Sequence, residues 1–153
     1  MKELWHPVPG YTGLYEVSDQ GRVRSLDRVS TCLNRWGSTT TCQLKGRVLR
    51  PGTQRNGRLY VCLSKDDTPW VVPIHKLVAL AFLGSRPNGS EIDHVNGDFR
   101  DNRAVNLEYV THQENQRRAY AMGKIDPPRS NRRDCNTGKF TTSKVQSLQR
   151  DAA

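Results

Sequence analysis

Four polar residues in the middle of the chain have the types and the spacing that hydrolysis of a phosphodiester requires. Asp93 and His94 are adjacent, Asn106 follows twelve residues later, and Asn115 follows nine residues after that. An Asp carboxylate is a hard oxygen ligand for a divalent cation, and histidine is a base that is largely neutral near physiological pH. The two amide oxygens could orient that base or complete the metal site. Together these side chains are the parts needed to cut a phosphodiester with one metal ion.

A strand, a loop, a second strand and a helix are expected to position these residues. The Asp-His pair is predicted to lie at the end of a strand, and residues 107–110 form the second short strand. Thr111 and Glu114 have the spacing of a capping box, which predicts a helix over about residues 112–122. Asn115 would then lie on the first turn of that helix.

The first half of the chain reads as short antiparallel strands joined by tight turns. Alternating apolar residues predict strands over residues 14–17, 22–26, 47–50, 58–63 and 70–74. Asn56-Gly57 is a type I′ turn signal, and the Ser- and Thr-rich residues 30–43 are predicted to be a flexible loop. A helix is expected over about residues 75–83, after Pro73.

The fold class that follows is α+β, in which a basic antiparallel β region precedes a compact α/β unit. We expect the β-rich region to cover residues 1–69, with a motif at about residues 5–28, and the second unit to cover residues 70–123. Residues 124–153 are basic and poor in apolar side chains, which predicts a disordered tail.

The charge balance favours a polyanionic partner. The 153 residues carry 24 Lys and Arg against 15 Asp and Glu, so the formal net charge is +9. Such a charge favours nucleic acid through neutralisation of phosphates, although a basic surface can also serve solubility alone. Arginines on the predicted strands and on the last helix are candidates for phosphate contacts or groove recognition: Arg22, Arg24, Arg47, Arg50, Arg58, Arg117 and Arg118.

Other sequence signals argue against a zinc finger, secretion and a membrane. None of the four cysteines forms a C-x-x-C pair, so no structural zinc is expected. The N-terminal residues lack an apolar signal segment, and no apolar run has the length of a membrane span. We therefore expect a cytoplasmic protein, in a bacterial host cell if a phage encodes it.

The polar residues resemble a known family. Asp93-His94, Asn106-Leu107 and Asn115 look like the HNH nuclease motif, in the variant of phage and intron-encoded homing endonucleases where Asn replaces the final His. Residues 75–82 also match that subgroup. Residues 10–18 and 21–26, with Trp5, look like the DNA-binding module often fused to such nucleases. The resemblance implies a ββα-metal (His-Me finger) core.

The resemblance also implies a role for each matched residue. Asp93 and Asn115 would bind one divalent cation, and this all-oxygen protein shell favours Mg²⁺ or Mn²⁺ over zinc. His94 would be the general base, and Asn106 would fix the orientation of its imidazole. The expected activity is metal-dependent cleavage of double-stranded DNA, a nick that leaves a 5′-phosphate and a 3′-hydroxyl.

Several alternatives stay open at this point. A monomer with one site would nick, whereas a dimer could cut both strands. A protein that binds DNA without catalysis, or one that acts on RNA, would share the basic strands. His75 opens an apolar helix, which favours a structural role over a contact with phosphate. His112, beside the helix cap, could reach DNA.

Overall fold

A computed structural model describes residues 2–33 and 35–124 of the chain. The chain divides after Asn115 into two units, and the first of them contains all the strands. The tail predicted for residues 124–153 lies, from residue 125 onwards, outside the described residues. No helix in the described part of the chain is long and apolar enough to cross a bilayer.

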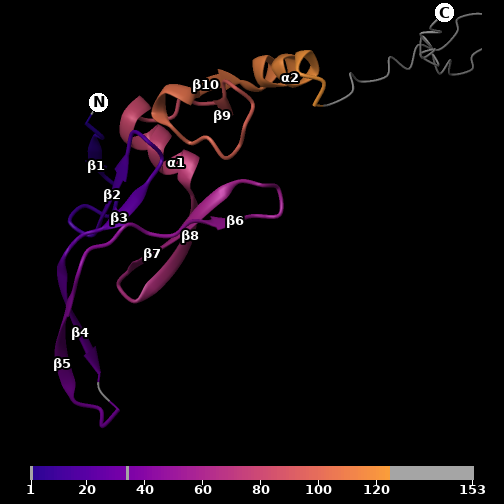
Figure 1. The fold of residues 1–153 in the computed structure, drawn as a ribbon. Helices are drawn as coiled ribbons and strands as arrows, with labels where there is room; N and C mark the ends of the chain where they lie inside the picture. Colours follow the sequence, from indigo (N-terminus) through magenta and orange to yellow (C-terminus); the bar gives the residue numbers. More distant parts are fainter. Residues whose placement is uncertain (1, 34, 125–153) are drawn as a thin grey trace, which may run out of the picture. The chain divides into compact units, whose positions relative to one another are not determined.

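Antiparallel strands dominate the first unit, as the sequence predicts (Figure 1). The strands are β1 (Trp5–Pro7), β2 (Tyr15–Ser18), β3 (Val23–Ser25), β4 (Arg28–Leu33), β5 (Thr39–Leu44), β6 (Gly52–Thr53), β7 (Leu59–Lys65), β8 (Thr68–Pro73), β9 (Ser90–His94) and β10 (Leu107–Thr111). The helical segments are α1 (Ile74–Val78), the π-helical turn η1 (Ala79–Leu83), the 3₁₀ turn η2 (Ala104–Asn106) and α2 (His112–Ala121). The strands form the sheets β1-β2-β3, β4-β5, β6-β7-β8 and β10-β9. The prediction of an α+β fold is therefore confirmed.

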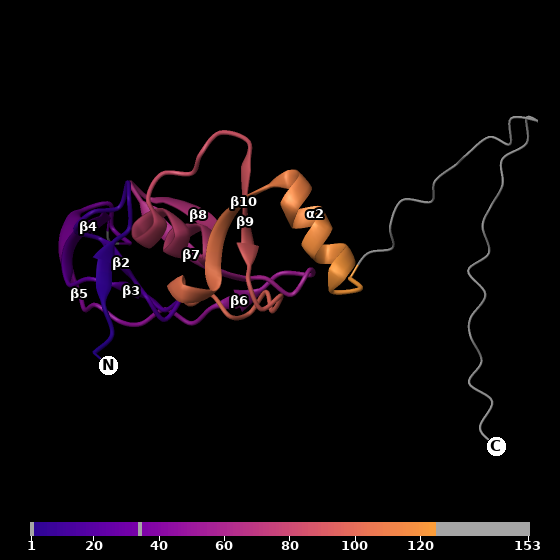
Figure 2. The same ribbon diagram turned by 90° about the horizontal axis from the view of Figure 1, so that it is seen from above.

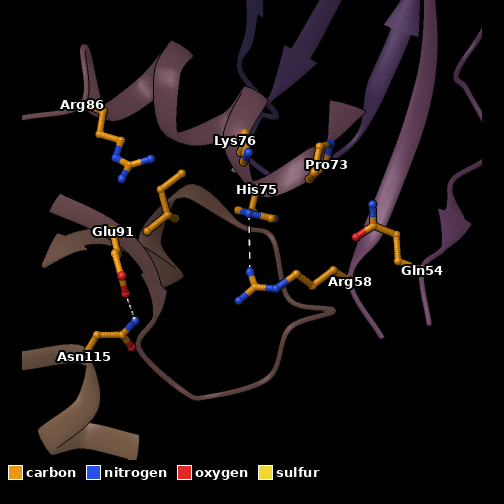
Figure 3. Close-up of a pocket in the computed structure, with 9 residues that line it drawn as sticks. Gln54, Arg58, Pro73, His75, Lys76, Arg86, Glu91 and Asn115 are labelled. Atoms are coloured by element: carbon orange, nitrogen blue, oxygen red, sulfur yellow. Dashed lines mark hydrogen bonds between the residues drawn. The ribbon is translucent and has the colours of Figure 1, made fainter. Parts of the chain in front are cut away.

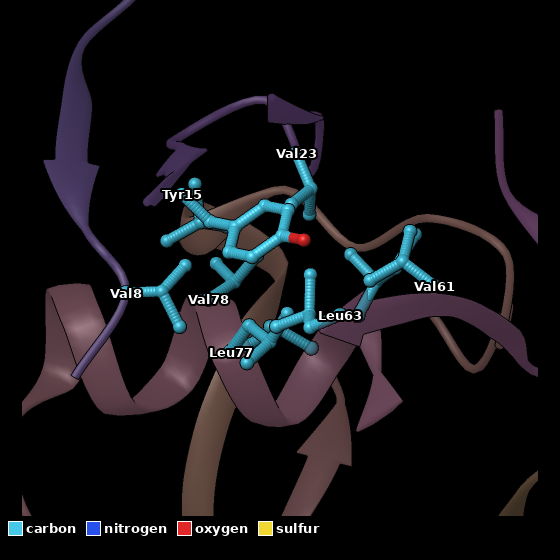
Figure 4. Close-up of a cluster of buried hydrophobic side chains, with 10 residues drawn as sticks. Val8, Tyr15, Val23, Val61, Leu63, Leu77 and Val78 are labelled. Atoms are coloured by element: carbon cyan, nitrogen blue, oxygen red, sulfur yellow. The ribbon is translucent and has the colours of Figure 1, made fainter. Parts of the chain in front are cut away.

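One hydrophobic core joins the N-terminal strands to the elements that follow them. Val8, Val17 and Val23 are fully or almost fully buried, and they pack in one cluster with residues of β7, α1 and β10 (Figure 4). The segment formed by α1 and η1 contacts β2, β7, β8 and β10, which places it at the centre of these elements (Figure 2). Because burial of apolar surface is the main stabilising term, the N-terminal strands and the later elements support one another.

The segment over residues 30–43, predicted to be a loop, is instead most of the β4–β5 hairpin. Six residue pairs join the two strands, from Arg28 opposite Leu44 to Leu33 opposite Thr39, and the ribbon extends away from the other strands (Figure 1). The loop was expected from the Ser and Thr content of this segment. The β-branched threonines, which favour extended backbone, had the stronger effect.

Two local predictions for residues that precede α1 were also wrong. The strand expected over residues 47–50 is reduced to a single bridge between Val48 and Arg24. The turn at Asn56-Gly57 has positive φ only at Gly57, whereas a type I′ turn needs it at both central residues. That geometry occurs instead at Asp66 and Asp67, between β7 and β8, where φ is 50° and 55°.

The shared core predicts a large difference between two leucine truncations. Leu63 on β7 is 0% exposed, whereas Leu4 is 57% exposed. Leu63→Ala leaves a cavity, so we expect it to lower the free energy of unfolding by about 2–5 kcal/mol. Leu4→Ala removes the same atoms from a largely solvated position and should cost less than about 1 kcal/mol. Urea unfolding followed by circular dichroism measures both, and equal losses would contradict the proposed core.

Candidate active site

The β9–β10 pairing decides which faces the polar residues of β9 occupy. Asp93 lies opposite Glu108, and His94 lies opposite Leu107. Successive side chains of a strand point to opposite faces, so Asp93 shares its face with Glu91 while His94 lies on the other side. Asp93 is half-buried, and its Oδ1 accepts a hydrogen bond of 2.8 Å from the backbone N–H of His94.

Glu91 connects this face of β9 to the start of α2. Its carboxylate accepts a hydrogen bond from Nδ2 of Asn115 at 2.5 Å, and its other oxygen lies 2.8 Å from Nδ1 of His112. These bonds, with that from Asn115 first, lower the pKa of Glu91. Glu91 is not among the site residues expected from the sequence. The signal that could have found it is its position two residues before Asp93, on the same face of the strand.

The helix begins where the capping box predicted it. The backbone N–H of Glu114 donates to Oγ1 of Thr111 at 3.2 Å, which satisfies one of the free donors of the first turn. Asn115 therefore lies on the first turn of α2, as expected from the sequence. The structure thus brings Asn115 to the face of β9 that carries Glu91 and Asp93.

His94 lies in the interior and its imidazole is held by Asn102. The residue is 1% exposed, and its ring packs edge-on against His75 and Phe99. Its Nε2 lies 3.4 Å from Oδ1 of Asn102, a long hydrogen bond. Burial lowers the pKa of His94, so the imidazole is neutral near pH 7.

The side chain of Asn106 is hydrogen-bonded to the loop that follows His94, and not to the imidazole as expected. The side chain of Asn106 accepts from the backbone N–H of Asn96 at 3.0 Å and donates to the backbone oxygen of Asp101 at 2.8 Å. It also donates to Oδ1 of Asn96. Asn106 therefore closes the loop between β9 and β10, while Asn102 contacts the His94 ring.

His75 is buried beside His94 and faces Arg58. The two imidazole centroids are 5.5 Å apart, and Nη1 of Arg58 lies 3.4 Å from Nε2 of His75. Burial, followed by the charge of Arg58, lowers the pKa of His75 to about 3. The guanidinium also lies 4.6 Å from the ring centre of Phe99. Arg58 thus reaches from the start of β7 into the site, and both histidines are neutral.

A cavity of about 340 Å³ opens beside these residues (Figure 3). Arg58, Lys76 and Arg86 bring positive charge to its wall, and Glu91 is the acidic residue there. The other lining residues are Gln54, Pro73, His75, Ile92 and Asn115. The cavity combines cations with the amide of Asn115, a composition that suits a phosphate group.

The remaining predicted arginines are distributed over other parts of the chain. Arg22 pairs with Glu3, and Arg24 pairs with Glu16 while lying over the Trp5 ring. These two cations are therefore partly neutralised within the protein. Three others do not line the cavity: Arg47, whose backbone is hydrogen-bonded to Ser25 of β3, Arg50 and Arg117 on α2 are all exposed. Arg118 belongs, like Arg117, to the second unit.

Two segments of the chain match known family models. Residues 72–117, which contain β9, β10 and the start of α2, match the family model described as HNH endonuclease. Residues 3–64 match the model of the NUMOD4 motif. These matches confirm the resemblance to HNH endonucleases of the homing type that was noted in the sequence.

Particular relatives come from a mimivirus and a phage. An uncharacterized HNH endonuclease of Acanthamoeba polyphaga mimivirus is 32% identical over 90% of this chain and 31% of its own length. DNA endonuclease I-HmuI of Bacillus phage SP01 is 28% identical over 80% of this chain and 60% of its own length. A solved structure that describes DNA binding and cleavage by the HNH homing endonuclease I-HmuI matches this chain with a TM-score of 0.64. The two sequences are 25% identical, and the match covers 81% of this chain and 62% of that chain. The chain thus spans less than two thirds of these relatives.

The contacts of Asn106 predict a stability effect that is independent of any activity. Asn106 is 6% exposed, and Asn106→Ala leaves the backbone N–H of Asn96 and the oxygen of Asp101 without their partner. We expect a loss of about 1–3 kcal/mol, visible as a lower melting temperature. Asn88→Ala, in an exposed turn, is the matched control and should melt like the parent. Equal melting of both variants would contradict the loop-closing role.

Proposed function

We propose that this chain is a divalent-metal-dependent endonuclease that nicks double-stranded DNA and leaves a 5′-phosphate and a 3′-hydroxyl. The observation that carries the proposal is the hydrogen bond from Asn115 to Glu91, on the face of β9 that the alternation of the strand also gives to Asp93. The family match supports a nuclease, and the relative I-HmuI is named as a DNA endonuclease. A single chain provides one such site, which favours a nick over a double-strand break.

The donor chemistry on this face fits Mg²⁺ or Mn²⁺. Within residues 2–33 and 35–124, no three His, Cys, Asp or Glu side chains form a cluster that could hold a metal. Asp93 and Asn115 would supply a carboxylate oxygen and an amide oxygen, which are the hard donors that both ions prefer. A bound divalent cation would polarise the scissile phosphate and stabilise the leaving oxygen.

His94 is our candidate for the general base. Its pKa is lowered by burial, so a lone pair is available near neutral pH. His75 is the competing candidate, because it lines the cavity whereas His94 lies behind it. Asn106 supports the site by holding the loop that follows His94.

The cationic wall of the cavity is our candidate for binding the DNA backbone. Arg58, Lys76 and Arg86 face the same space as Asn115. Charge-assisted hydrogen bonds to phosphate would hold a strand beside the metal-binding residues. Contacts outside the cavity would come from four further arginines: Arg47, Arg50, Arg117 and Arg118. Arg22 and Arg24 could add to them if DNA phosphates replaced their carboxylate partners Glu3 and Glu16.

The proposed activity predicts a metal-dependent conversion of supercoiled plasmid. With Mg²⁺ or Mn²⁺ the plasmid should become relaxed before linear product forms, and EDTA should abolish the conversion. Gel electrophoresis separates the three forms. A relaxed product that cannot be resealed by ligase would contradict the predicted 5′-phosphate and 3′-hydroxyl. The absence of cleavage with either metal, by a protein that still binds DNA, would support the non-catalytic alternative.

Substitution of the two candidate bases separates their roles. We expect His94→Ala to lower the rate of nicking by at least ~10²-fold while DNA binding is retained, because the base acts only in the chemical step. Asp93→Ala should also lose nicking when its rate is measured at the metal concentration that saturates the parent. His112→Ala, at a residue that contacts Glu91 from an exposed position, should have a much smaller effect. If His75→Ala loses nicking and His94→Ala does not, the base has been assigned to the wrong histidine.

A further inference from the structure

We propose that the turn between β2 and β3, within the NUMOD4 motif, positions the imidazole of His94 through Asn102. The N-terminal region would then be a structural part of the catalytic centre as well as a candidate DNA-binding element. This inference rests on the proposed function, because it takes His94 as the base.

The first step is the hydrogen bond between Asn102 and His94. Asn102 is 4% exposed, and its Nδ2 donates to the backbone oxygen of Arg100 at 3.0 Å. That bond fixes the amide, because a rotated amide would place two oxygens against each other. Oδ1 of Asn102 therefore faces Nε2 of His94, 3.4 Å away. Since an amide oxygen only accepts, Nε2 must carry the proton.

The second step follows from the chemistry of a neutral imidazole. Such a ring carries one N–H, so a proton on Nε2 leaves the lone pair on Nδ1. Nδ1 of His94 has no hydrogen-bond partner among the described residues. Asn102 thus selects the nitrogen that is left to accept a proton. Asn102 is a positioning residue, since it acts through His94.

The third step is the packing of the β2–β3 turn against the segment that contains Asn102. A Cβ on Gly21 would lie 2.9 Å from the backbone oxygen of Asn102 and 3.0 Å from its Cβ. Two residues before Gly21, the backbone oxygen of Asp19 accepts from the N–H of Ala104 at 2.8 Å. The turn therefore holds the segment 102–104 by direct contact and by a hydrogen bond.

Gly21 has the conformation that this approach requires. Its φ is 78°, which L side chains rarely adopt, and its N–H closes the turn on the oxygen of Ser18 at 3.1 Å. Any larger residue must displace either the turn or Asn102. Gly13 is the matched control, because its φ is 79° but a Cβ there would meet nothing within 4 Å in the described part of the chain.

Nitrogen-15 NMR of the metal-free full chain tests the first two steps without any activity. At about pH 8, where histidine is neutral, the ring of His94 should show the Nε2–H tautomer. His94→Ala assigns the signals by removing them. Asn102→Asp keeps an acceptor and should keep this tautomer, whereas Asn102→Leu should shift the ring toward a mixture. An Nδ1–H tautomer in the parent, or no change in Asn102→Leu, would overturn the inference.

Steady-state nicking kinetics test the third step. We expect Gly21→Ala and Asn102→Leu each to lower kcat by about tenfold with little change in KM, because binding is retained while the base is misplaced. Gly13→Ala should leave kcat unchanged. The double variant should resemble Asn102→Leu alone, since two changes in one chain of contacts are not additive. Equal loss in Gly13→Ala and Gly21→Ala, or multiplied losses in the double variant, would overturn the coupling.

Failure of the proposed function gives a different pattern. If the parent chain does not cleave DNA with any metal, the nuclease proposal fails. The NMR spectra of the parent, Asn102→Leu and Gly21→Ala still decide whether the turn and Asn102 hold the imidazole. A Gly21→Ala protein that is folded, as judged by circular dichroism, and keeps the tautomer of the parent would overturn the positioning role even then.

Discussion

The antiparallel pairing of β9 with β10 is the constraint on which the candidate site depends. A shift of one residue in this register would move every side chain of β9 to the opposite face. In the observed register, Glu91 and Asp93 share the face that meets Asn115, and His94 enters the interior. The loop between the strands must close in a matching way, and Asn106 closes it with three side-chain hydrogen bonds.

Burial and one cation together determine the protonation of the interior histidines. Burial is the largest cause of the lowered pKa of both His75 and His94, and the charge of Arg58 acts in the same direction on each. A neutral imidazole can then be steered by its neighbours: Asn102 accepts from one ring, and Arg58 donates to the other. Under the tautomer proposed for His94, the two adjacent histidines carry their protons on different ring nitrogens, because their partners differ.

The shared core gives the two family matches a common physical basis. Val8, Val17 and Val23 from the NUMOD4 region pack with Leu107 of β10 in one cluster. The helix α2 adds no buried residue to this core, so the HNH region joins it through β10 and the segment after Pro73. Contacts from the N-terminal strands, such as that of Gly21 with Asn102, therefore contribute to the shape of the site as well as to its stability.

The amino-acid sequence by itself determined the identity of the polar residues and the local elements that carry them. The period of apolar residues predicted β9, β10 and the helical segment after Pro73, and the capping box placed Asn115 on the first turn of α2, because these features depend on neighbours along the chain. It did not show that Glu91 contacts Asn115, or that Asn102 rather than Asn106 contacts the His94 ring. Those pairings join side chains from different elements, and several asparagines and carboxylates have equal chemical claims to them. Only the tertiary structure decided among them, because register, loop closure and the approach of the β2–β3 turn select which polar groups come within hydrogen-bonding distance.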